Sequence, residues 1–165
     1  MNGISAIRHR NDVREGTRTF SLPADNFATV KSTIESGRDQ WAGVVVTNED
    51  GRILLVENGW SDGWVVPGGT VEVDETLAGA AVREVAEETG VSIELDGPLL
   101  VERQTFTHDG KAVSGHFVLF GGTADEAEIG SDLGVEGETI CDARWFTTLP
   151  ELTIDYRAEI EAFRG

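Results

Sequence analysis

Three glutamates lie close enough in the sequence to bind one metal ion together. Glu84, Glu87 and Glu88 stand at relative positions zero, three and four, so a helix would place their carboxylates on one face. Like charges at these offsets weaken an isolated helix by roughly 0.2–0.5 kcal/mol per pair, and we therefore expect a cation against this face. Oxygen ligands of this kind suit Mg²⁺ or Mn²⁺ better than zinc. The alternative is an acidic helix face that is simply solvated.

The residues around the glutamates predict a loop followed by a helix, which would position them. Gly68 and Gly69 let the loop backbone adopt unusual dihedral angles and approach a metal ion or a phosphate closely. Thr76 is a suitable N-cap for the helix and Gly90 a suitable stop after its last turn. The apolar positions between these two residues are Leu77, Ala80, Ala81 and Val85.

Arg83 lies four residues before Glu87, close enough on a helix to form an ion pair that holds the carboxylate in place. With this arginine, the spacing over residues 69–91 resembles the signature of the Nudix hydrolase family. The matching pattern is Gly69, five residues, Glu75, seven residues and then REVAEETGV from residue 83. The resemblance continues in WVVPGG before the signature and in RWF at residues 144–146, and it covers about residues 40–152.

Two positions depart from the commonest form of this signature. Asp74 stands where a glycine usually precedes the first glutamate, and Gly79 stands in the first helical turn, where a glutamate would complete a capping box with Thr76. Each departure costs about 1 kcal/mol or less. Neither residue is an expected ligand, so the departures concern the shape of the loop and not the chemistry.

The resemblance implies an α/β fold, namely an α/β/α sandwich in which helices flank a mixed β-sheet. It also implies metal-dependent hydrolysis of the pyrophosphate bond in a small nucleoside diphosphate-linked substrate, such as an NDP-sugar, ADP-ribose or a dinucleoside polyphosphate. A house-cleaning nucleoside triphosphate pyrophosphatase is the alternative within the same chemistry. A non-catalytic nucleotide-sensing domain is a further alternative, although such a domain would have no need of intact carboxylates.

The resemblance assigns roles to particular residues of this chain. Metal ligands for Mg²⁺ or Mn²⁺ are expected at Glu84, Glu87, Glu88 and the carbonyl of Gly68. The catalytic residues are expected to be Arg83, Glu84, Glu87 and Glu88, with Glu84 or Glu88 as a candidate base. Glu75 is expected to orient Arg83 or the loop. Substrate contacts are expected from Glu72, Trp64 and Arg52. A further glutamate, Glu136 or Glu138, could come from the acidic stretch 124–139.

The length of 165 residues predicts one Nudix domain at residues 41–165, with residues 1–40 as an N-terminal extension packed on it. The extension should contain a short strand near residues 17–22 and a helix at 25–36. In the domain, Asp-Gly pairs at 50–51 and 109–110 predict two hairpins. We also expect strands at 92–95 and 98–108, a surface loop at 123–139, a last strand at 140–147 and a closing helix at 154–163.

The charge of the chain excludes some partners. With 30 acidic and 13 basic residues the net charge is −17, which disfavours long nucleic acid and anionic membranes. No apolar run approaches a membrane span, and a single cysteine, Cys141, suits the cytoplasm. The acid-rich, lysine-poor composition is similar to that of proteins from salt-loving microbes, so we expect a halophilic protein. The expected partner is a small nucleotide-derived substrate, and the sequence leaves a homodimer open.

Overall fold

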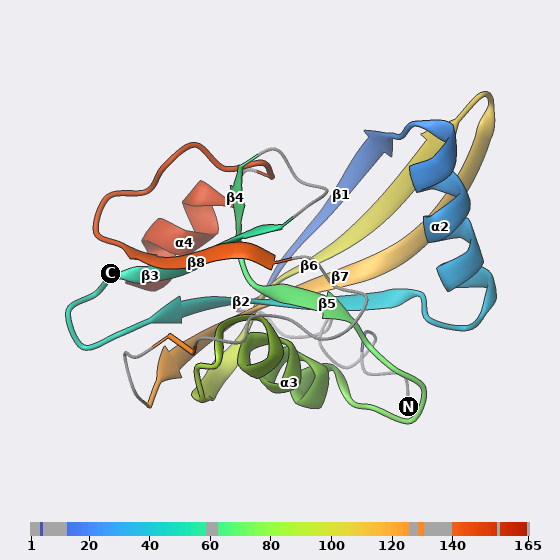
Figure 1. The fold of residues 1–165 in the computed structure, drawn as a ribbon. Coiled ribbons are helices and arrows are strands. Elements are labelled where there is room, and N and C mark those ends of the chain that lie inside the picture. The colour runs from blue at the N-terminus through green and yellow to red at the C-terminus, as the bar shows by residue number, and fades with distance from the viewer. Residues whose placement is uncertain are drawn as a thin grey trace.

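The computed structural model describes residue 4 and residues 13–58, 63–125, 129–130, 140–154 and 156–164. Among these residues, three helices separate groups of one, four and three strands or close the chain (Figure 1). The strands are β1 (Arg14–Ser21), β2 (Gln40–Thr47), β3 (Ile53–Asn58), β4 (Trp64–Val65), β5 (Gly68–Thr70), β6 (Ile93–His108), β7 (Lys111–Ala124) and β8 (Ile140–Phe146). The helices are α2 (Ala24–Glu35), α3 (Leu77–Thr89) and α4 (Arg157–Arg164).

The strands form one mixed sheet. Its main order is β1-β6-β7-β2-β3-β4, while β5 pairs with β2 and β8 pairs with β3. The pairs β1–β6 and β2–β7 are parallel, and the other pairs are antiparallel. Strand β5, which carries the glycine pair, therefore lies beside β2 near the middle of the sheet.

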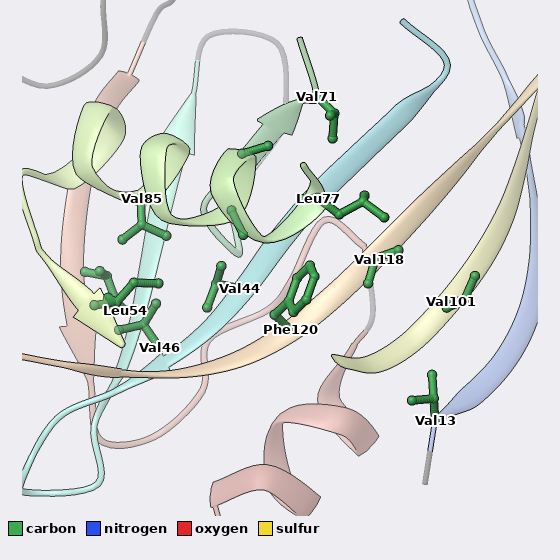
Figure 2. Close-up of a cluster of buried hydrophobic side chains, with 14 of the residues drawn as sticks. Val13, Val44, Val46, Leu54, Val71, Leu77, Val85, Val101, Val118 and Phe120 are labelled. Carbon is green, nitrogen blue, oxygen red and sulfur yellow. The ribbon is translucent and has the colours of Figure 1, made fainter. Parts of the chain in front are cut away.

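Helices cover both faces of the sheet, because its central strands are apolar on both sides. On β2, Val44 and Val46 face the core that includes Val85 of α3. Val45 faces the second core, which includes Ile160 of α4. Figure 2 shows Val85 of α3 pointing toward Leu54 and Val46 in the first core. The expected α/β/α sandwich with a mixed sheet is confirmed.

The N-terminal segment contributes a strand to the same sheet. Strand β1 runs parallel to β6, in register from Arg14 opposite Leu100 to Ser21 opposite Thr107. Helix α2 follows and lies near the far ends of β6 and β7 (Figure 1), where the buried ring of Phe27 is 6.0 Å from the ring of His108. The boundary expected at residue 40 stays a prediction.

Both Asp-Gly turns are present. Asp109 and Gly110 both have positive φ values, 48° and 76°, as a two-residue hairpin turn of this kind requires. After the Asp50-Gly51 turn, β2 and β3 pair only where Thr47 meets Ile53, because β2 continues beside β5 and β7 while β3 continues beside β8 and β4.

Two expected elements differ from those observed. The strands expected at 92–95 and 98–108 are one strand, β6, whose pairing with β7 shifts register on either side of residues 97–98. The closing helix begins at Arg157 rather than at residue 154, since its first hydrogen bond runs from the Ile160 N–H to the Tyr156 carbonyl. Within the described residues, no helix is both long and apolar enough to cross a membrane.

Candidate active site

Helix α3 begins and ends where its sequence predicts. The Thr76 side chain accepts a hydrogen bond from the Gly79 N–H at 2.9 Å, so Thr76 is the N-cap. Gly90 has a φ of 74° and ends the helix in the left-handed region. The Thr89 carbonyl accepts a hydrogen bond from the Gly130 N–H at 2.8 Å. The helix therefore has fixed ends, and its glutamates point in defined directions.

Arg83 binds three of the signature glutamates at once. Its guanidinium donates to both carboxylate oxygens of Glu75, at 2.7 and 2.8 Å, to Glu84 at 2.9 Å and to Glu87 at 3.1 Å. A further bond, at 3.0 Å, reaches the Thr70 carbonyl. All five N–H groups of the guanidinium are used in this way. The predicted pair with Glu87 is present, and Glu75 orients Arg83 as expected.

This cluster shifts the protonation of its members. The hydrogen bonds from Arg83 lower the pKa of Glu75 below its ordinary value. The same bonds, with the charge of Glu84, raise the pKa of Arg83, so the arginine stays charged. The loop before α3 is thus tied to the helix by an ion pair in which both partners remain ionised at neutral pH.

Glu84 and Glu88 are buried against the glycine pair of β5, with exposed fractions of 3% and 5%. The Gly68 N–H donates to the Glu88 carboxylate at 2.6 Å. A Cβ atom on Gly69 would lie 2.5 Å from the carboxyl carbon of Glu84, and a Cβ on Gly68 would collide with the Ala42 carbonyl. Glycine at position 69 therefore lets the backbone approach Glu84 closely, and glycine at position 68 lets β5 lie close to the β2 backbone.

The donor types at this place fit a hard divalent cation. Glutamate oxygens and a loop carbonyl are the ligands that Mg²⁺ and Mn²⁺ prefer. All three of the expected ligand carboxylates have protein partners here. Glu84 and Glu87 accept hydrogen bonds from Arg83, and Glu88 accepts one from the Gly68 N–H. Among the described residues, no three His, Cys, Asp or Glu side chains are gathered around one point. A cation would therefore have to compete with these hydrogen bonds for the carboxylates.

Of the three expected substrate contacts, Glu72 lies beside the cluster around Arg83, where its N–H donates to the Glu75 carboxylate at 3.1 Å, whereas Trp64 and Arg52 lie elsewhere. Glu72 is exposed and lies 3.6 Å from Arg38. Trp64 packs edge-on against Phe146, and the guanidinium of Arg144 lies over its ring. Arg52 is exposed in the turn beyond β2. Since β5 pairs with β2 only near Gly43, this turn is more than about 13 Å along the strand from the glycine pair.

Trp64 also borders a cavity of about 460 Å³. The cavity lies between the start of β4 and the segment that precedes α4, and it is lined by Gly63, Trp64, Pro150, Glu151, Leu152 and Thr153. Glu136 and Glu138, expected on the acidic loop, lie outside the described residues; of that loop the structure describes residues 123–125 and 129–130. Sequence reasoning did not find the Thr70 carbonyl as a partner of Arg83, because a backbone contact across 13 residues leaves no pattern in side-chain types.

Comparisons with known proteins agree with this geometry. A family model described as the NUDIX domain matches residues 38–159. The MutT-like protein of Streptomyces ambofaciens is 49% identical to this chain over 55 residues, which are 33% of this chain and 35% of that protein. The matched stretch thus spans about a third of that curated relative.

Two solved structures show the same fold. The MutT NUDIX hydrolase from Burkholderia pseudomallei has a TM-score of 0.53 and 28% identity, with 74% of this chain and 95% of that chain covered. A UDP-X diphosphatase has a TM-score of 0.55 and 22% identity, with 86% of this chain and 70% of that chain covered. At the lower identity the likeness concerns the fold alone.

Proposed function

This chain belongs to the NUDIX domain family, and on that premise we propose that it hydrolyses the pyrophosphate bond of a small nucleoside diphosphate-linked substrate with Mg²⁺ or Mn²⁺. The substrate would be of the NDP-sugar, ADP-ribose or dinucleoside polyphosphate type. The observation that carries the proposal is the burial of Glu84 and Glu88 against the Gly68–Gly69 backbone, where Glu84 also binds Arg83 and Glu88 accepts from the Gly68 N–H. Buried carboxylates are costly to fold, and their presence is explained if a cation and a phosphate bind beside them.

The proposed ligands of the cation are Glu84, Glu87, Glu88 and the carbonyl of Gly68. When bound, the cation would offset the negative charge of the diphosphate and acidify a water molecule for attack on phosphorus. Glu84 or Glu88 would accept the proton from that water. Arg83 would act as a positioning residue, because it holds Glu84 and Glu87 on one side and Glu75 of the loop on the other.

The remaining substrate contacts are proposed on fewer observations. Trp64 is the strongest of the three expected contacts, since it borders a cavity large enough to hold part of a small molecule. Glu72 is supported by its N–H, which donates to Glu75 beside Arg83, and Arg52 stays a proposal without a supporting contact among the described residues. A cytoplasmic location and a halophilic origin also stay proposals, supported by the single cysteine and by the net charge of −17.

The proposal is tested by product analysis over a panel of NDP-sugars, ADP-ribose, dinucleoside polyphosphates and nucleoside triphosphates, with Mg²⁺ or Mn²⁺ and after chelation. We expect turnover of at least one diphosphate-linked compound, loss of turnover with chelator and recovery with either metal. Preference for a triphosphate would favour the house-cleaning alternative. Full turnover after exhaustive chelation would contradict the metal assignment.

The Glu88→Gln variant tests the carboxylate face itself. It keeps the shape of the side chain and removes its charge, so turnover should fall by roughly 10²- to 10⁴-fold. The matched control is Glu94→Gln, an exposed glutamate on β6, which should keep normal turnover. If the folded Glu88→Gln variant retained near-normal turnover, the face would be structural, and a nucleotide sensor would become the better proposal.

A further inference from the structure

A second polar cluster lies on the α4 side of the sheet, outside the site described above. Glu102 and Gln104 of β6 are 4% and 7% exposed, although they share the strand face of Leu100, which belongs to the apolar core under α4. Tyr156, which directly precedes α4, is 3% exposed. Its hydroxyl donates to Glu102 at 3.0 Å, and the Gln104 amide donates to Glu102 at 2.9 Å. Burial beside Glu102 raises the pKa of Tyr156, so the phenol keeps its proton.

Arg18 of β1 supplies the positive charge of this cluster. Its Nε atom lies 3.1 and 3.2 Å from the two carboxylate oxygens of Glu102. Its guanidinium lies over the Tyr156 ring, 5.2 Å from the centroid, and that ring in turn stacks on Phe117 at 5.4 Å. The plane and direction of the guanidinium are therefore fixed from two sides.

The two terminal amino groups of Arg18 have no hydrogen-bond acceptor among the residues that the structure describes. A structural ion pair commonly uses two parallel N–H bonds to the carboxylate, but here Nε alone spans both oxygens. Within the described parts of the chain, no residue accepts a hydrogen bond from either Nη atom, and the Arg18 side chain is 33% exposed. Glu159, one turn after Tyr156, is paired with Arg14 at 2.7 Å, so its charge is offset.

We propose that Arg18, held by Glu102 and Tyr156, forms a second anion-binding site that takes a phosphate group of a small ligand. A fixed guanidinium whose two amino groups have no acceptor among the described residues matches the oxygens of a phosphate, and such charge-assisted bonds are the strong ones. Arg18 lies before residue 38, where the family match begins, so the N-terminal segment supplies the cation of this site, while Glu102 and Tyr156 lie within the matched residues.

This site is distinct from the carboxylate face of α3. The register places Gly16, Glu102, Phe117, Trp41 and Thr70 in one line across β1, β6, β7, β2 and β5. Four strand spacings of about 4.8 Å separate the ends of this line by roughly 19 Å at the backbone. A phosphate on Arg18 is thus either the far end of an extended substrate or a separate small anion.

The chain offers a reporter for this site, because Tyr156 is its only tyrosine. In protein labelled with ¹³C on tyrosine, the ring signals of Tyr156 are followed by NMR while inorganic phosphate is added at constant ionic strength with chelator present. We expect a saturable shift in the wild type. In Arg18→Met binding should weaken by roughly 10- to 100-fold, the range for losing hydrogen bonds to a charged group. Arg18→Lys should bind more weakly than the wild type, since it keeps the charge and loses the paired amino groups.

The matched control is Arg103→Met, which removes the same charge from an exposed position on β6 opposite Thr17, and it should bind as the wild type does. Since Arg18→Met leaves Glu102 buried without its cation, the double variant Arg18→Met/Glu102→Gln restores neutrality and should fold and fail to bind. Absence of a phosphate-dependent shift in the wild type, or equal binding by the folded Arg18→Met or double variant, would overturn the proposal.

The source of the phosphate is tested separately, by steady-state kinetics with a substrate that the protein hydrolyses. If Arg18→Met raises KM and leaves kcat unchanged, the site holds the distal phosphate of the substrate. If KM is unchanged while phosphate binding is lost, the site holds a free phosphate. Both outcomes support the phosphate site. Because the binding measurement does not depend on turnover, failure of the proposed hydrolase activity would not contradict the phosphate site.

Discussion

Arg83 and Glu75 join helix α3 to the loop before it through two short hydrogen bonds. Because these bonds lower the pKa of Glu75, the folded protein binds the ionised carboxylate in preference to the protonated one. The resulting stability is present above the unfolded pKa of about 4.3 and is lost as the pH falls through the lower folded value. We therefore expect Glu75→Gln to be less stable than the wild type at pH 7, with a gap that narrows below about pH 4.

Urea unfolding over a pH series measures this gap. Glu94→Gln is the control, since this exposed glutamate forms no ion pair with any described residue, and the stability of the variant should follow that of the wild type over the same pH series. A gap for Glu75→Gln that stayed constant down to pH 2 would show that the ion pair contributes no charge-dependent stability.

At the scale of elements, the end of α3 is held by a contact with the acidic loop. A Cβ atom on Gly90 would lie 2.7 Å from the Cα atom of Gly130, and Gly90 also has a positive φ. Gly37, which ends α2, has a positive φ of 93° but open space around it. We expect Gly37→Ala to destabilise the protein by about 1 kcal/mol through the backbone alone, and Gly90→Ala to destabilise it by more.

Thermal melts of the two variants separate backbone strain from contact. The difference between the melting temperatures of Gly37→Ala and Gly90→Ala reports how closely the loop at Gly130 is packed on α3, the helix that carries Glu87 and Glu88. Equal melting temperatures would mean that the loop at Gly130 moves away from the added methyl group at little cost in free energy, and that it does not fix the end of α3.

For the molecule as a whole, the net charge of −17 is the dominant physical property. Self-repulsion of this size opposes the compact state, and salt reduces it because the screening length falls from about 10 Å at 0.1 M to about 3 Å at 1 M. We expect the melting temperature to rise steadily between about 0.1 M and about 1 M KCl. An uncharged osmolyte at equal osmolality is the control. A melting temperature that does not depend on salt would mean that the acidic residues contribute to solubility and not to salt-dependent stability.

Features set by neighbouring residues were predictable from the sequence alone. Thr76 and Gly90 mark the ends of α3 because capping and the left-handed stop depend on a few adjacent residues. The offsets of Glu84, Glu87 and Glu88 are fixed by helix geometry, and the Asp109-Gly110 turn is fixed by the positive φ values that its residues tolerate. These local rules also support the family resemblance, which rests on spacing.

Features that join distant parts of the chain were decided only by the tertiary structure. The expected contacts from Glu72, Trp64 and Arg52 are scattered, since strand pairing and not sequence proximity sets which loops meet. Arg18 and Glu102 are 84 residues apart, and nothing in either segment indicates that β1 pairs in parallel with β6. The sequence of β6 carries polar residues at 102 and 104 among other polar residues, so it does not show that these two are buried; burial with complementary partners is a property of packing, which sequence patterns do not encode.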